Sequence, residues 1–122
     1  NRRYYFCLED GLNMLTDELS PNELIFFMKL VKYLSYNSGK LMYSNGRAIT
    51  TTKLVDILNK PKSTVYRLIN KLSSKNVIKV VENGSKNVIY VNPFICFKGS
   101  YVNESLFNMF KDSKFNTYLY KF

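Results

Sequence analysis

The chain has 122 residues, of which 46% are apolar and 16% aromatic, and it carries a net charge of +9. This composition is too apolar for a disordered segment, and no apolar run reaches the ~18 residues that a membrane-spanning helix needs, so we expect no membrane partner. Histidine is absent, the cysteines number two and the carboxylates are scattered, which removes the commonest general base and a four-ligand zinc site. We therefore expect neither an enzyme nor a cofactor.

Residues 1–19 are expected to form an N-terminal extension, with a short strand or extended segment over residues 4–8 and a brief helical turn over residues 12–15. Acidic residues follow the first basic ones too soon for a signal peptide. Cys7 and Cys96 lie far apart in the sequence and are interpreted as small buried apolar side chains rather than as a disulfide framework. These features predict a cytoplasmic protein.

A long helix is predicted over residues 21–36. Ser20 has the N-cap position, Pro21 the first helical position and Glu23 the acceptor position of a capping box. The run Asn37-Ser38-Gly39 ends the helix, which is apolar almost all round. The face assigned to the core comprises Leu24, Phe27, Met28, Val31 and Leu34. The apolar residues left over, which need a neighbour within the chain or from a partner subunit, are Phe26, Leu30 and Tyr33.

Two shorter helices follow a brief strand at Ile49-Thr50. Thr51 is expected to cap the first, which ends near Asn59, and Pro61 to open the second. The apolar residues of the second helix recur at i, i+3, i+4 and i+7, the spacing of one buried stripe. They are Val65, Leu68, Ile69 and Leu72. Only a tight turn fits between the two helices, which predicts a helix-turn-helix.

Two runs of β-forming residues, 77–81 and 88–91, flank the sequence Asn83-Gly84-Ser85-Lys86. An Asn-Gly pair between such runs predicts a β-hairpin. Further on, Asn103 and Glu104 can start a helix through Lys111, which an aromatic tail follows.

A helix-turn-helix followed directly by a hairpin is the winged-helix arrangement. The predicted fold class is α+β: a winged helix-turn-helix, mainly helical, with a small antiparallel β-hairpin wing and a C-terminal helix. We expect a single domain over residues 1–122, with the winged-helix core in residues 20–92 and the C-terminal helix and aromatic tail in residues 93–122.

Two thirds of the excess positive charge lies in residues 60–86, where seven Lys and Arg residues accompany Glu82 alone, a net charge of +6. Such concentration is typical of a protein with a polyanionic partner. The second helix of a helix-turn-helix lies in the major groove of DNA, where Arg67 suits guanine and Asn70 suits adenine. Serine and tyrosine hydroxyls suit phosphates, as does Thr64 together with free backbone amides at the helix start.

The candidate DNA-binding residues are Lys60, Lys62, Ser63, Thr64, Tyr66, Arg67, Asn70, Lys71, Ser85 and Lys86. The alternative for the helix is an exposed polar face without a ligand. The alternative for Ser85 and Lys86, at the hairpin tip, is a solvated turn.

Several motifs along residues 20–115 occur in a recognisable order. They are Thr51-Thr52-Lys53-Leu54, Ser63-Thr64-Val65, Leu72, Val77-Ile78, Val91-Asn92-Pro93 and Phe97-Lys98-Gly99. In this order they resemble the RepL-like replication initiators of plasmids and phages. The resemblance implies origin binding and recruitment of host replication proteins, without ATPase or nicking activity. It also implies that Asn92, Pro93 and Gly99 shape the return of the chain from the wing. The chain departs from the family at Pro61, where the turn more often carries Ser, and in its long aromatic tail.

We therefore expect sequence-specific binding of double-stranded DNA by a plasmid or phage replication initiator or maintenance protein. A transcriptional repressor and a DNA segregation or conjugation accessory protein use the same binding chemistry, and these alternatives stay open. From another class, a winged helix can serve only as a protein-interaction module, whose basic stripe would bind an acidic protein.

A homodimer is expected on three grounds. The apolar residues left over on the helix of residues 21–36 need cover, and a two-fold dimer doubles the contacts of a single recognition helix. The C-terminal aromatic residues add more apolar surface than a monomer should expose. They are Phe107, Phe110, Phe115, Tyr118, Tyr120 and Phe122. The alternative is a monomer whose tail folds over its own first helix.

Overall fold

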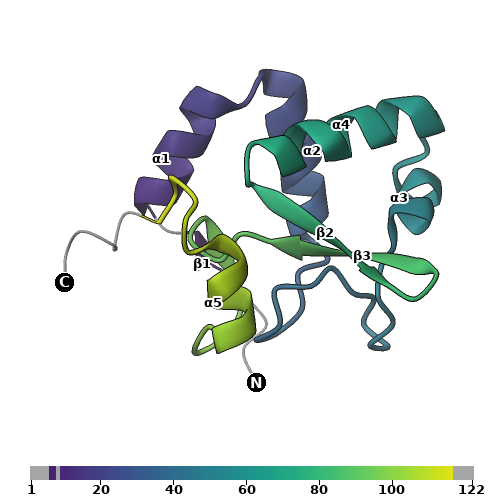
Figure 1. Cartoon of the computed structure of the whole chain (residues 1–122). Coiled ribbons are helices and arrows are strands. Elements are labelled where there is room, and N and C mark those ends of the chain that lie inside the picture. The colour runs from purple at the N-terminus through teal and green to yellow at the C-terminus, as the bar shows by residue number, and fades with distance from the viewer. Residues whose placement is uncertain (1–5, 8, 117–122) are drawn as a thin grey trace.

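Figure 1 shows the computed structural model, which describes residues 6–7 and 9–116. This part of the chain is α+β, as predicted. In chain order its elements are β1 (Phe6–Cys7), α1 (Glu9–Glu18), α2 (Pro21–Val31), α3 (Thr51–Leu58), α4 (Lys62–Ser74), β2 (Ile78–Asn83), β3 (Lys86–Val91), β4 (Cys96–Phe97) and α5 (Glu104–Phe110). The β2–β3 hairpin reaches out on one side beside α3 and α4, while α1, β1 and α5 lie on the other side (Figure 1). None of the described helices has the length and apolar character that crossing a membrane requires.

The N-terminal segment contains a full helix rather than a brief turn. α1 spans ten residues and buries Leu15 in the core, and Leu19, directly after the helix, is buried as well. Gly11 allows close packing of this helix, because a Cβ there would lie 2.2 Å from the main-chain oxygen of Phe94. The predicted first strand is present as β1, and residues 4, 5 and 8 of that prediction lie outside the described residues. α1 and Leu19 therefore contribute to the core.

α2 begins as predicted and ends earlier. The Ser20 hydroxyl accepts a hydrogen bond from the Glu23 backbone N–H at 3.3 Å, and the Glu23 carboxylate accepts one from the Ser20 N–H at 3.1 Å. These two bonds complete the capping box. The helix ends at Val31 because the chain beyond it turns back on itself and Leu34 forms an antiparallel bridge with Leu41.

The buried face of α2 differs from the predicted one. Phe26 and Leu30 are buried, whereas Met28, which was assigned to the core, is 58% exposed. α2 runs through the middle of the molecule (Figure 1), so neighbouring elements cover it from more than one side. Phe26 and Leu30 are therefore covered within the chain, the first of the two alternatives, and they give no reason to expect a partner subunit.

The apolar stripe of α4 and the C-terminal aromatic residues complete the core. The stripe is buried as its spacing predicts, at Val65, Leu68, Ile69 and Leu72. α5 starts after the N-cap Asn103, also as predicted. Phe110 and Phe115 are each only 1% exposed, so their assignment to a dimer surface is wrong. Phe107 remains partly exposed, with its ring edge-on to Phe94 and 5.6 Å between the centroids. The tail residues Tyr118, Tyr120 and Phe122 lie outside the described residues.

Asn92 fixes the direction of the chain after the hairpin. Its buried side-chain amide donates to the main-chain oxygen of Asn76 at 2.8 Å and to the Ser113 hydroxyl at 3.0 Å. Its side-chain oxygen accepts from the Phe94 N–H at 2.9 Å. Gly99 follows with φ +146°, where a Cβ would lie 1.9 Å from the side-chain oxygen of Asn37. Both positions thus shape the chain.

The two cysteines are not independent apolar side chains. Cys96 is disulfide-bonded, and the backbone of Cys7 is its partner in the antiparallel β1–β4 pair. The interpretation of the two residues as separate small side chains is therefore wrong. The pairing of β1 with β4, which joins distant parts of the sequence, accounts for the difference.

Candidate functional site

α3 and α4 are joined by a short turn whose capping differs in detail from the prediction. Thr50, not Thr51, is the N-cap of α3, and its hydroxyl accepts from the Lys53 N–H at 3.4 Å. Asn59 closes α3 in the left-handed conformation, with φ 51°. Pro61 is the N-cap of α4, and its carbonyl oxygen accepts from the Thr64 N–H at 3.0 Å. The Thr64 amide is therefore engaged within the turn, and its hydroxyl remains a predicted phosphate donor.

The outward face of α4 presents the polar side chains that the periodicity predicts. Ser63, Arg67, Asn70 and Lys71 are exposed and Tyr66 is half-buried. These five residues and Ser74 line an open surface hollow of about 580 Å³. Arginine, asparagine and hydroxyl groups on one helical face are the types that read base edges and bind phosphates in a groove.

Lys60, in the turn before α4, and Thr64, in its first turn, lie on another side of the helix. They line a groove of about 170 Å³ between α2 and α4, which Arg67 also borders. Ile25 and Phe26 of α2 form part of its wall. Lys60 and Thr64 therefore line this groove and not the hollow that Tyr66 lines.

Tyr66 connects α4 with the N-terminal end of α3. Hydrogen bonds with the side chains of Thr52 and Thr51 lower the pKa of the Tyr66 hydroxyl, and the positive charge of Lys62 lowers it further. The Lys62 Nζ atom lies 5.5 Å from the centroid of the Tyr66 ring. Tyr66 thus lies beside the start of α3 as well as on the outward face of α4.

The β2–β3 hairpin brings its tip to the same end of α3. Gly84 and Ser85 form its two-residue loop, and Gly84 has φ +69°, a conformation that glycine adopts without strain. Thr50 forms an antiparallel bridge with Val88 of β3. This bridge ties the start of α3 directly to the hairpin.

A hollow of about 520 Å³ lies between the hairpin tip and the start of α3. Three basic residues from three separate segments line it: Arg47, Lys53 and Lys86. Thr52 and Ser85 also border it. Arg47, Thr52 and Lys53 were not among the predicted site residues. Arg47 precedes the basic stretch of residues 60–86, and no local signal shows that the Thr50–Val88 bridge brings it there.

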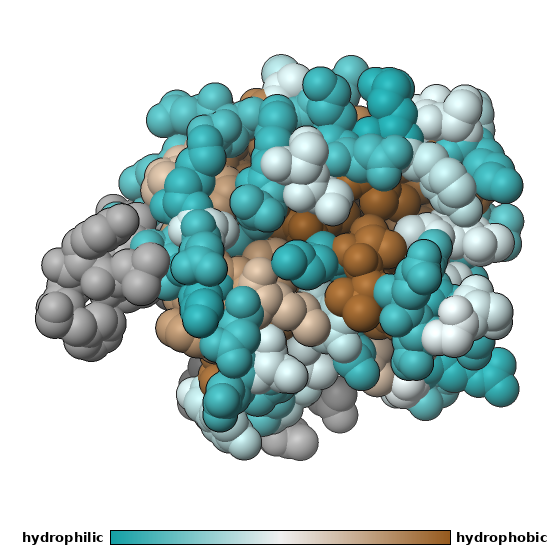
Figure 2. Space-filling view, in the orientation of Figure 1, coloured by the Kyte–Doolittle hydropathy of each residue, from teal (hydrophilic) through white to brown (hydrophobic). Residues whose placement is uncertain are grey.

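We call the cations of this region the basic edge. Together with the half-buried Lys53, it comprises the exposed residues Arg47, Lys62, Arg67, Lys71 and Lys86. Tyr66 of α4 lies beside Thr52 of α3, so the cations of α4 are next to those around the hairpin tip. Hydrophilic side chains line the right-hand side of Figure 2, from the N-terminal end of α4 past α3 to the hairpin tip. Hydrophobic side chains gather over the hairpin below α4 in the same view.

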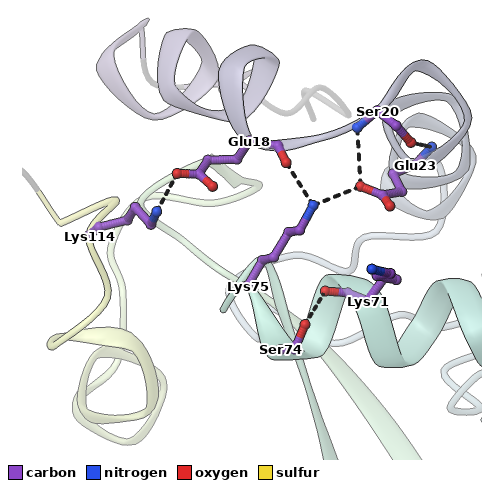
Figure 3. A network of polar contacts seen from close by, with 7 residues as sticks. All are labelled: Glu18, Ser20, Glu23, Lys71, Ser74, Lys75 and Lys114. Atoms are coloured by element: carbon purple, nitrogen blue, oxygen red, sulfur yellow. Dashed lines mark hydrogen bonds and ion pairs between the residues drawn. The ribbon is translucent and has the colours of Figure 1, made fainter.

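Two lysines of the basic stretch have structural contacts instead. The Lys75 Nζ atom donates to the main-chain oxygen of Glu18 at 2.7 Å and to Glu23 Oε1 at 3.0 Å (Figure 3). The Lys79 Nζ atom lies 5.9 Å from the centroid of the Phe110 ring. The net charge of residues 60–86 thus overstates what this segment presents on one surface.

Among the described residues, no group of three or more His, Cys, Asp or Glu is placed to hold a metal ion. Comparison of the sequence and structure with protein families, with curated proteins and with solved structures finds no match.

Proposed function

We propose that the chain is a winged-helix protein that binds double-stranded DNA in a sequence-specific manner. The observation that carries the proposal is the basic edge. Cations from α4, from α3, from the hairpin tip and from the Arg47 turn are next to one another although they are scattered in the sequence. A polyanion that runs along this edge would meet all of them.

In the proposed complex, α4 lies in the major groove and the hairpin is the wing. Arg67 and Asn70 are directed to base edges, where guanine and adenine are their usual partners. Ser63, Tyr66 and the lysines of α4 bind phosphates and fix the register. Arg47, Lys53 and Lys86 bind the phosphate backbone beside the groove.

The proposed biological role is that of a plasmid or phage replication initiator or maintenance protein, in keeping with the RepL-like motif order, with host replication proteins as further partners. Such a role belongs in the cytoplasm, and the disulfide at Cys96 removes the cysteine-based ground for that location. A homodimer also remains a proposal, now only because two-fold symmetry doubles the DNA contacts.

Selection of bound sequences from a random duplex pool, followed by affinity measurement at physiological salt, tests the proposal. We expect enrichment of a defined site and tighter binding to it than to unrelated duplex. A winged helix that serves only as a protein-interaction module would bind no duplex under these conditions, and that result would overturn the proposal.

A further inference from the structure

A second groove, of about 730 Å³, lies where the chain leaves α2 and turns through residues 42–46. Tyr33, Tyr36 and Tyr43 line it together with Lys32 and Lys98. We call it the tyrosine groove. None of the described residues that line it is acidic. Its chemistry is therefore that of aromatic rings and positive charge.

The turn of residues 43–47 separates the tyrosine groove from the hollow at the hairpin tip. Tyr43 lines the groove, and Arg47, at the other end of the turn, lines the hollow. The Tyr43 N–H donates to the main-chain oxygen of Arg47 at 2.8 Å, which holds the turn together. The Lys53 Nζ atom lies 5.4 Å from the centroid of the Tyr43 ring. The tyrosine groove is thus a neighbour of the basic edge.

We propose that the tyrosine groove binds unpaired nucleotides of a DNA strand that continues from the duplex on the basic edge. The position of the strand rests on the proposed duplex binding. Aromatic side chains stack on bases irrespective of sequence, and lysines neutralise the phosphates between them. The groove has the size of sites that take small organic ligands, which suits a nucleotide. Tyr36 is 58% exposed, so its ring can meet a base without rearrangement of the fold.

The test compares a blunt duplex of mixed sequence with the same duplex carrying a single-stranded extension of about six nucleotides at either end, within the range of single-strand sites. Fluorescence anisotropy at physiological salt measures both affinities. We expect the extension to tighten binding roughly five-fold or more, the lower end of what one stacked base contributes. Tyr36→Ala should abolish this gain and leave blunt-duplex affinity unchanged. Tyr36→Phe, which keeps the ring, should keep the gain.

Two further variants make the result specific to the groove. Lys32→Gln removes an exposed cation of the groove and should also reduce the gain in affinity from the extension. If Tyr36→Ala lowers the thermal unfolding midpoint, the affinity of Lys32→Gln for tailed and blunt duplex is the test of the groove instead. Tyr101→Ala is the matched control, because Tyr101 is 68% exposed and does not line the groove. It should leave every affinity unchanged.

The outcomes separate this inference from the proposed function. Equal affinity for tailed and blunt duplex would overturn the inference and leave duplex binding intact. Binding of single strand that depends on Tyr36, without any duplex binding, would support the groove and overturn the proposed function. If deoxyadenosine monophosphate alone binds in a Tyr36-dependent manner while the extension adds nothing, the occupant is a free nucleotide and the inference is overturned.

Discussion

The Lys75 Nζ atom lies 3.0 Å from Oε1 of Glu23, which joins the C-terminal end of α4 to the first turn of α2 (Figure 3). The side chains of the pair are 28% and 12% exposed, respectively. Lys71, one turn earlier on the same helix, is exposed and belongs to the basic edge. Two lysines four residues apart thus differ in their surroundings: Lys75 contacts an acidic residue, whereas Lys71 is exposed.

The first prediction contrasts these two lysines. Lys75→Ala should lower the free energy of unfolding by about 1–3 kcal/mol, because Glu23 loses a charged hydrogen-bond partner, and it should change duplex affinity little. Lys71→Ala should weaken duplex binding and leave stability almost unchanged. Urea denaturation and duplex titration measure the two effects. Greater destabilisation by Lys71→Ala than by Lys75→Ala would show that the roles are reversed.

The second prediction concerns pH. The hydrogen bond from Lys75, and next the one from the Ser20 N–H, lower the pKa of Glu23 below its ordinary value of 4.5. A carboxyl whose pKa is lower in the folded state stabilises the fold above its unfolded pKa, and this contribution is lost as the pH falls through the folded pKa. The free energy of unfolding should therefore fall more steeply below pH 4.5 in the natural chain than in Glu23→Gln.

Denaturant unfolding at a series of acidic pH values measures this difference. Glu82→Gln, which removes an exposed carboxylate from the hairpin, is the control for the loss of one charge. Parallel pH profiles for the natural chain and Glu23→Gln would contradict the assignment.

A third prediction uses the salt dependence of duplex binding. Each phosphate contact adds roughly 0.9 to the magnitude of the slope of log affinity against log salt. Arg47→Ala, Lys53→Ala and Lys86→Ala should each reduce the slope by about that amount and weaken all duplexes alike. Lys79→Ala should leave the slope unchanged, because Lys79 lies over the Phe110 ring. Affinity that does not depend on salt would argue against the basic edge as the duplex site.

The fourth prediction separates base readers from phosphate contacts. Arg67→Ala and Asn70→Ala should each weaken binding to the selected site by about 1–3 kcal/mol and relax preference at one position. Lys86→Ala should keep the sequence preference. Repeated selection with each variant measures both quantities. An unchanged preferred site for Arg67→Ala would mean that the outward face of α4 does not read the bases.

The fifth prediction concerns the C-terminal segment and the oligomeric state. Deletion of residues 112–122 removes Ser113, Phe115 and Asn116, all of which are buried. We expect the deletion to lower the free energy of unfolding by several kcal/mol, in the range of truncating a buried aromatic residue. Sedimentation at micromolar concentration, with and without the selected duplex, shows whether the chain dimerises. A deletion that separates a dimer into stable monomers would contradict the structural role of Phe115.

The elements that the sequence by itself determined depend on residues close together in the chain. The capping box of Ser20 and Glu23, the buried stripe of α4 and the β2–β3 hairpin all follow from such local relationships. The outward positions of α4, including Arg67 and Asn70, follow from the buried stripe. In a helix of about 3.6 residues per turn, the buried positions determine which positions lie on the opposite face. These parts of the candidate site could therefore be predicted.

Only the tertiary structure decided which side of α2 is covered, because a helix that is apolar all round contains no signal of its orientation. Phe26 is buried and Met28 exposed as a result of the elements packed around α2. In the same way, the β1–β4 pair that contains Cys96 joins strands far apart in the sequence.

The tertiary structure also decided which residues make up the basic edge. The sequence shows how many cations lie in residues 60–86, but not which of them forms an ion pair with an acidic side chain. Lys75 forms an ion pair with Glu23. The bridge between Thr50 and Val88 places Arg47 and Lys53 beside the hairpin. Hydrogen bonds and ion pairs act over a few ångströms of space, and only the fold determines which residues come that close.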